Sequence, residues 1–323
     1  MMLRAVKAAR QSGQWLLGKM VRHAVILGYH RISEGPDPYQ LSVSPQRMAE
    51  QLAVLTRIAH PLSLGELPEM LAAGRLPKRA VAVTFDDGYA DVLHRAKPLL
   101  AQFGVPATVF VISGVLGGEL WWDRLNRITS SIDGHDRRLT LPIGDALFNW
   151  PVEGVEPSTG SLRRALYPKL RALNHPARNA VLDELGELMG VPTDVTGIGL
   201  QRVVTADELR RLGDGGLVQI GAHTMTHPAL SQLSAEQQRE EIAGSRRELE
   251  VALDRRVTGF SYPFGDTGPG VGTIVDEAGF QYACGSRNAV AWRGTDRFFL
   301  PRFWMGNWDG PRFAGWLERW LDD

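Results

Sequence analysis

Short apolar runs that each end in polar residues recur along the chain, and they predict buried strands. The run at residues 80–85 leads into Asp-Asp-Gly, the run at 217–222 leads into a histidine, and the run at 257–262 leads into Pro-Phe-Gly. An earlier run at residues 23–30 also ends in a histidine. Segments with helical periodicity lie between these runs. The alternation predicts an α/β fold with parallel strands arranged as a barrel.

Helix-start signals mark several of the segments between the strands. Ser44 precedes a proline and an apolar stripe, which is typical of a helix beginning at Pro45. Thr205 and Ser234 are each followed three residues later by Glu or Gln, the pattern of a capping box. Near the end of the chain, residues 300–303 predict a further strand and residues 311–321 a closing helix.

The alternation of strands and helices breaks down between residues 121 and 200. Residues 162–173 and 177–189 keep helical periodicity, with a turn between them at residues 174–176. We therefore expect a largely helical insertion above the barrel mouth. Insertions at such a position often shape substrate access, although a purely structural excursion is the alternative.

Four ionisable residues follow the predicted strands and are expected to converge. Asp86 and Asp87 end one strand, and His223 and His227 follow another. The carboxyl ends of barrel strands meet at one face, so these side chains are expected to lie together. Two adjacent carboxylates repel each other unless a cation or proton lies between them. One carboxylate and two imidazoles suit a divalent metal; a solvated Asp-Gly turn is the alternative.

Three motifs built on these residues resemble those of a known family. They are Thr-Phe-Asp-Asp-Gly at residues 84–88, His-Thr-x-x-His-Pro at 223–228, and Tyr-Pro-Phe-Gly at 262–265. In this order they resemble the first three motifs of the polysaccharide deacetylases (NodB-homology, carbohydrate esterase family 4). The resemblance covers residues 23–303. It implies a distorted (β/α) barrel and metal-dependent hydrolysis of N-acetyl groups on sugars.

The resemblance also implies roles for individual residues. Asp87, His223 and His227 match the metal ligands, and Asp86 matches the catalytic base. The backbone N–H of Phe264 matches a donor to the oxyanion. Zinc is the expected ion for such ligands, and cobalt, nickel or manganese are alternatives.

Two positions depart from the family pattern. Ser261 stands where the family has an arginine that orients the catalytic aspartate, and Arg302 is our candidate substitute; a surface salt bridge is the alternative role. No histidine follows His227, whereas the family acid is a late histidine. His30, in Gly-Tyr-His-Arg, resembles the early histidine of the biofilm poly-N-acetylglucosamine deacetylases. We expect His30 to act as general acid, a core histidine being the alternative.

Aromatic residues near these motifs are candidates for sugar stacking. Five of the nine tryptophans lie between residues 292 and 320. We name Trp122, Tyr262, Trp304 and Trp308 as candidate substrate contacts. Ordinary packing of the aromatic rings is the alternative.

Composition narrows the functional class. Lys and Arg together number 36, as do Asp and Glu, so no basic field predicts nucleic-acid binding. The single cysteine, Cys284, excludes an intrachain disulfide and a cysteine-rich zinc site.

The amino-terminal segment, residues 1–22, precedes the expected catalytic domain at residues 23–323. It contains five basic residues interleaved with apolar ones, and its apolar stretches are too short for a membrane span. A basic amphipathic helix on an anionic membrane surface is one interpretation, and a helix packed on the barrel is the other. We expect a cytoplasmic location with possible membrane association.

The sequence thus predicts a metal-dependent hydrolase that removes acetyl from an amino sugar in a glycan or glycolipid. Hydrolysis of an O-acetyl ester or a cyclic amide at the same site is an alternative within enzymes. A carbohydrate-binding protein without catalysis is the alternative from another class. The sequence does not indicate an oligomeric state.

Overall fold

The structure is a computed structural model that describes residues 22–35, 37–130, 138–151, 158–192 and 198–321. The helix expected in residues 1–22 therefore falls almost wholly outside the described residues. No helix in the described ranges is long and apolar enough to cross a membrane.

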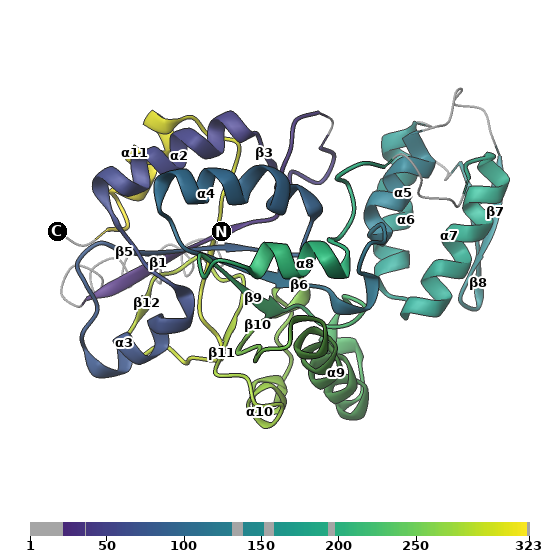
Figure 1. The fold of residues 1–323 in the computed structure, drawn as a ribbon. Helices are drawn as coiled ribbons and strands as arrows, with labels where there is room; N and C mark the ends of the chain where they lie inside the picture. Colours follow the sequence, from purple (N-terminus) through teal and green to yellow (C-terminus); the bar gives the residue numbers. More distant parts are fainter. Residues whose placement is uncertain (1–21, 36, 131–137, 152–157, 193–197, 322–323) are drawn as a thin grey trace, which may run out of the picture.

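One curled, mostly parallel sheet forms the centre of the molecule (Figure 1). Its nine strands have the order β11-β10-β9-β6-β5-β1-β12, with β13 paired to β1 and β4 paired to β5. Their bounds are β1 (His23–Tyr29), β4 (His60–Pro61), β5 (Ala80–Phe85), β6 (Ala107–Val111), β9 (Val218–Ala222), β10 (Gly259–Ser261), β11 (Tyr282–Cys284), β12 (Ala291–Trp292) and β13 (Phe303–Trp304). The curled sheet and its surrounding helices form a distorted (β/α) barrel, as predicted.

The central strands are apolar on both faces because helices cover both sides of the sheet. Every residue of β1 and β5 is buried, and the two strands pair in parallel from Ala24↔Ala80 to Tyr29↔Phe85. Continuous apolar runs are typical of such doubly covered parallel strands. The predicted strand at residues 300–303 is shorter than expected: an isolated bridge joins Leu300 to Cys284, and regular pairing begins only at Phe303.

Helices α2, α4 and α11 lie along one side of the sheet, and α3, α9 and α10 along the other (Figure 1). The capping boxes at Thr205 and Ser234 form as predicted, and Gly104 ends α4 in the left-handed conformation. The helix bounds are α2 (Pro45–Ile58), α3 (Leu67–Ala73), α4 (Lys97–Phe103), α8 (Ala206–Gly213), α9 (Ala235–Leu253), α10 (Val271–Glu277) and α11 (Gly310–Leu317), with short helical turns η1 (Leu64–Glu66), η2 (Val92–Ala96), η3 (Ser113–Val115), η4 (Leu230–Gln232) and η5 (Pro263–Gly265).

A separate group of elements between β6 and β9 stands at one side of the sheet (Figure 1). It contains α5 (Trp121–Ser130), α6 (Thr159–Arg171), α7 (His175–Met189) and a hairpin of β7 (Leu139–Ile143) and β8 (Ala146–Trp150). We call this group the insertion. It is mostly helical, but the antiparallel hairpin was not predicted. A further two-residue pair, β2 (Arg31–Ile32) and β3 (Ser42–Val43), follows the first strand.

Candidate active site

The four predicted residues meet at the carboxyl ends of two strands, β5 and β9, which are separated in the sheet by β6. Asp86 and Asp87 directly follow β5, and His223 directly follows β9. They border a cavity of about 380 Å³, together with His30, Tyr39, Gln40, Leu41, Trp122, Tyr167, His227, Phe264, Gly265, Ser286, Trp304 and Met305. The sheet therefore brings together residues that lie more than 130 positions apart.

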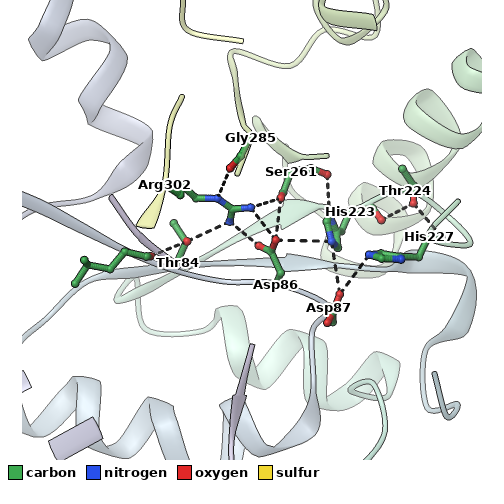
Figure 2. Close-up of polar contacts among 10 residues, drawn as sticks. Thr84, Asp86, Asp87, His223, Thr224, His227, Ser261, Gly285 and Arg302 are labelled. Atoms are coloured by element: carbon green, nitrogen blue, oxygen red, sulfur yellow. Dashed lines mark hydrogen bonds and ion pairs between the residues drawn. The ribbon is translucent and has the colours of Figure 1, made fainter. Parts of the chain in front are cut away.

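Asp87, His223 and His227 form a compact set of possible metal ligands (Figure 2). Asp87 Oδ1 lies 3.5 Å from His223 Nε2 and 3.6 Å from His227 Nε2. One ligand atom from each residue lies within 4.8 Å of the other two. All three residues are buried. The geometry allows a single ion to contact one oxygen and two nitrogens.

The chemistry of these donors fits a divalent cation. His223 Nδ1 lies 2.7 Å from the carbonyl oxygen of Ser261, and donating there leaves the Nε2 lone pair directed at Asp87. Burial lowers the pKa of both His223 and His227, so the imidazoles are neutral, the form that binds metals. Burial and the neighbouring Asp86 raise the pKa of Asp87. A cation among these atoms would relieve the repulsion between electron-rich groups.

The backbone at this site is held in left-handed conformations. The φ angles of Asp87, Thr224, His227 and Phe264 are 71°, 65°, 55° and 59°. Such angles are uncommon outside glycine and gather at functional sites. Gly88 has a φ of 74°, and a Cβ there would lie 2.8 Å from Val111 Cγ1. The turn after β5 therefore needs glycine directly after the aspartate pair.

Arg302 pairs with Asp86 inside the protein (Figure 2). Its Nη1 donates to Asp86 Oδ1 at 2.7 Å and its Nη2 to Oδ2 at 2.8 Å. Further donations go to Gly285 O, Thr84 Oγ1 and Ser261 Oγ, so five hydrogen bonds match the five N–H groups. Burial alone would raise the pKa of Asp86, but Arg302 and then His223 bring it well below its usual range. The pair is buried, unlike a surface salt bridge.

His30 borders the same cavity and stacks on Trp304, with ring centroids 4.5 Å apart. Burial lowers the pKa of His30 to about 4, against the opposing effect of Asp86. The imidazole is therefore neutral near pH 7 in the resting protein.

Phe264 connects the cavity to the insertion. Its ring lies edge-on to His227, with centroids 4.5 Å apart, and the Arg171 guanidinium lies 4.1 Å above the Phe264 ring. Arg171 belongs to α6. The insertion thus packs on the loop that carries the expected oxyanion donor.

Two of the four aromatic candidates border the cavity and two do not. Trp122 and Trp304 line it. Tyr262 is fully buried instead, and its hydroxyl donates to Phe298 O at 2.9 Å, which turns the ring into the core. Trp308 packs near Trp316 of α11, with centroids 5.7 Å apart. Tyr262 and Trp308 therefore do not line this cavity, unlike Trp122 and Trp304.

The structure adds aromatic residues that the sequence analysis missed. Tyr39 donates to Trp122 O at 2.9 Å, and its ring lies near that of Tyr167, with centroids 5.6 Å apart. Both tyrosines line the cavity. Tyr167 lies on a predicted helix of the insertion, and an aromatic residue on that helix could have been named as a candidate substrate contact. Tyr39 lies in a loop without such a signal.

Glu241 on α9 holds the loop between the two histidines. Its carboxylate accepts from Met225 N at 2.8 Å, from Thr226 N at 2.9 Å and from Thr226 Oγ1 at 2.5 Å. No local pattern in the sequence marks this residue, because it lies 14 positions after His227 in an otherwise charged helix.

Comparison with solved structures supports the fold. The Streptococcus pyogenes deacetylase PplD superposes with a TM-score of 0.61 at 18% identity, over 92% of this chain and 98% of that one. IcaB from Ammonifex degensii gives a TM-score of 0.60 at 20% identity, over 92% and 97% of the two chains.

Sequence comparison identifies relatives over part of the chain. The poly-β-1,6-N-acetyl-D-glucosamine N-deacetylase of Staphylococcus aureus (strain MRSA252) is 31% identical over 110 residues, 30% of this chain and 38% of the relative. The Escherichia coli (strain K12) protein of the same name is 35% identical over 86 residues, 26% of this chain and 13% of the relative. The matches therefore span well under half of these relatives.

The polysaccharide deacetylase family profile matches residues 73–136 and 161–283, more than half of the 323 residues. This chain belongs to the polysaccharide deacetylase family.

Proposed function

We propose that this protein hydrolyses the N-acetyl group of an amino sugar within a glycan or glycolipid. The observation that carries the proposal is the set of Asp87, His223 and His227 beside the Arg302-paired Asp86, in one aromatic-lined cavity. The names of the relatives agree with this substrate class.

In this proposal Asp87, His223 and His227 would hold a divalent cation, with zinc the expected ion. The cation would polarise the acetyl carbonyl and lower the pKa of a water molecule from 15.7 towards about 7. Asp86 would accept the proton of the attacking water, and Arg302 keeps this carboxylate ionised and oriented. The Phe264 N–H would donate to the oxygen on which negative charge develops.

His30 would protonate the departing amine. Its place in the cavity supports this role. Because burial keeps the resting imidazole neutral, the role requires that His30 gain a proton in the substrate complex. The Trp122 and Trp304 rings would pack against the apolar faces of the sugar.

Acetate release from β-1,6-linked N-acetylglucosamine oligomers tests the proposal, with acetylated xylan and small cyclic imides as competing substrates. Asp86→Asn should retain bound metal, measured by elemental analysis, and lose turnover. His223→Ala should lose both. Asp145→Asn and His60→Ala, at exposed positions, are matched controls that should resemble wild type.

Full turnover by Asp86→Asn would refute the base assignment. Full turnover by His30→Ala would remove the general-acid role while leaving the metal site standing. Faster acetate release from xylan would redirect the proposal to an ester, and faster ring opening of the imides would redirect it to a cyclic amide. Glycan binding without acetate release from any substrate would favour a carbohydrate-binding protein.

A further inference from the structure

A second cavity lies on the other side of His227, between the barrel and the insertion. Its volume is about 300 Å³. His227 lines both cavities, and Trp121 borders the second as its neighbour Trp122 borders the first. The remaining lining residues are Ile112, Val115, Glu119, Leu120, Arg124, His175, Arg178, Asn179, Asp183 and Thr226.

Arg178 of α7 is the unusual member of this lining. It is 1% exposed, yet its side chain makes a single hydrogen bond, from Nη2 to Thr226 O at 3.0 Å. The guanidinium lies 5.0 Å from the ring centroid of Trp121. Nε and Nη1 have no hydrogen-bond partner among the residues that the structure describes. A guanidinium has five N–H donors, so most of its capacity is unused.

The acidic residues of this cavity are already paired with other arginines. Asp183 accepts from Arg124 at 2.6 Å. Glu119 accepts from Arg127 Nε at 3.0 Å and from Nη2 at 2.8 Å. Within the described part of the chain, no carboxylate makes an ion pair with the guanidinium of Arg178. The charge of Glu241, which does not line the cavity, raises the pKa of Arg178, but no carboxylate of the lining pairs directly with this guanidinium.

Burying a charge without a partner is unfavourable, and proteins rarely do so without a compensating group. Burial lowers the pKa of Arg178 to about 10, which leaves it charged at neutral pH. The cation–π contact and one carbonyl offset only part of the desolvation. A ligand with negative charge would supply the direct hydrogen-bond acceptors that Nε and Nη1 lack.

We infer that this cavity binds a small carboxylate through Arg178. A single guanidinium beside a histidine and an amide suits a monoanion better than a doubly charged phosphate. Asn179 and His175 line the same cavity as Arg178. The Nδ2 atom of Asn179 lies 2.9 Å from the Nε2 atom of His175. The existence of the site is independent of the proposed function. Its assignment to acetate, released on the other side of His227, rests on that function.

Binding of ¹³C-labelled acetate to the full chain tests the inference by NMR line broadening. Sodium chloride at equal ionic strength is the reference, and each titration is run with and without EDTA to separate this site from the metal ligands. We expect saturable acetate binding in both conditions. Arg178→Met should raise the acetate Kd about tenfold or more, because hydrogen bonds to a charged group are lost. Arg164→Gln, at an exposed position on α6, should bind like wild type.

Thermal unfolding separates a binding role from a structural one. Arg178→Met should unfold no earlier than wild type in acetate-free buffer, because it removes an unpaired buried charge. If that variant does not fold, Arg178→Lys should fold and bind acetate more weakly than wild type. Equal binding by wild type and the Arg178 variant, or no wild-type binding beyond that of chloride, would overturn the inference.

Glucuronate distinguishes the source of the carboxylate. Tighter binding of glucuronate than of acetate through Arg178 would support the site and assign it to an acidic sugar of the glycan. Tighter binding of acetate would assign it to the released product. Because binding is measured without turnover, failure of the deacetylase assay would leave this result intact.

Discussion

Replacing Arg302 with methionine should destabilise the protein strongly. The change removes two short hydrogen bonds to Asp86 and leaves that carboxylate, 2% exposed, without its cation. It also removes donors to Gly285 O, Thr84 Oγ1 and Ser261 Oγ. Breaking a buried pair in this way costs about 3–5 kcal/mol, mainly because a buried charge is left uncompensated. Urea unfolding in EDTA, extrapolated linearly to water, measures the loss without a contribution from bound metal.

Two companion variants test the reasoning behind this magnitude. Arg302→Met combined with Asp86→Asn removes both charges, so it should recover much of the lost free energy of unfolding. Arg297→Met breaks an arginine–aspartate pair in which both side chains are more than half exposed, and it should cost less than about 1 kcal/mol. A loss below 1 kcal/mol for Arg302→Met, or no recovery in the double variant, would refute the argument.

Three further predictions concern pH, metal affinity and backbone strain. Burial raises the pKa of Asp91 to about 6, so the protonated Asp91 carboxyl contributes its full stabilisation below about pH 4, and this is lost as the pH rises through 6. Between pH 4.5 and 7 the free energy of unfolding should therefore fall less for Asp91→Asn than for wild type, and equal falls in urea titrations would contradict this. Glu241→Ala should weaken metal binding by about 10–100-fold, because Glu241 holds the loop between the two histidines, whereas Glu240→Ala, at an exposed position, should not. Equal metal affinities of the two variants, measured by competition with a chelator, would disprove this role of Glu241. Gly88→Ala should cost about 1–3 kcal/mol because of its positive φ and the contact with Val111, and an unchanged free energy of unfolding would show that the turn relaxes.

The barrel could be predicted because its strands are continuous apolar runs with clear ends. The hairpin of β7 and β8 was missed although its alternation is present in Leu139–Ile143 and Ala146–Trp150, around Gly144 and Asp145. A two-residue turn between alternating runs is a hairpin signal, but Pro142 weakens the first run as a strand. The hairpin also forms a sheet of its own, so no strand of the main sheet pairs with it and supports its assignment as β-structure.

The ligand residues could be predicted because each follows a strand end within a short motif. Residues that act from outside those motifs were harder to predict from the sequence. The direction of the Tyr262 side chain depends on which face of the strand is buried, and the sequence alone did not settle it. Tyr39 and Glu241 reach the site through tertiary packing, which leaves no periodic signal.

The buried pairing of Arg302 with Asp86 has a consequence for searching sequences. The guanidinium reaches the carboxylate from a segment 216 positions away, while Ser261 contributes only a hydroxyl. Arg302 also lies beyond the residues that the family profile matches. A search that demands an arginine within the third motif would discard such a chain as defective. The position of the guanidinium beside Asp86 matters for the site, whichever segment of the sequence carries the arginine.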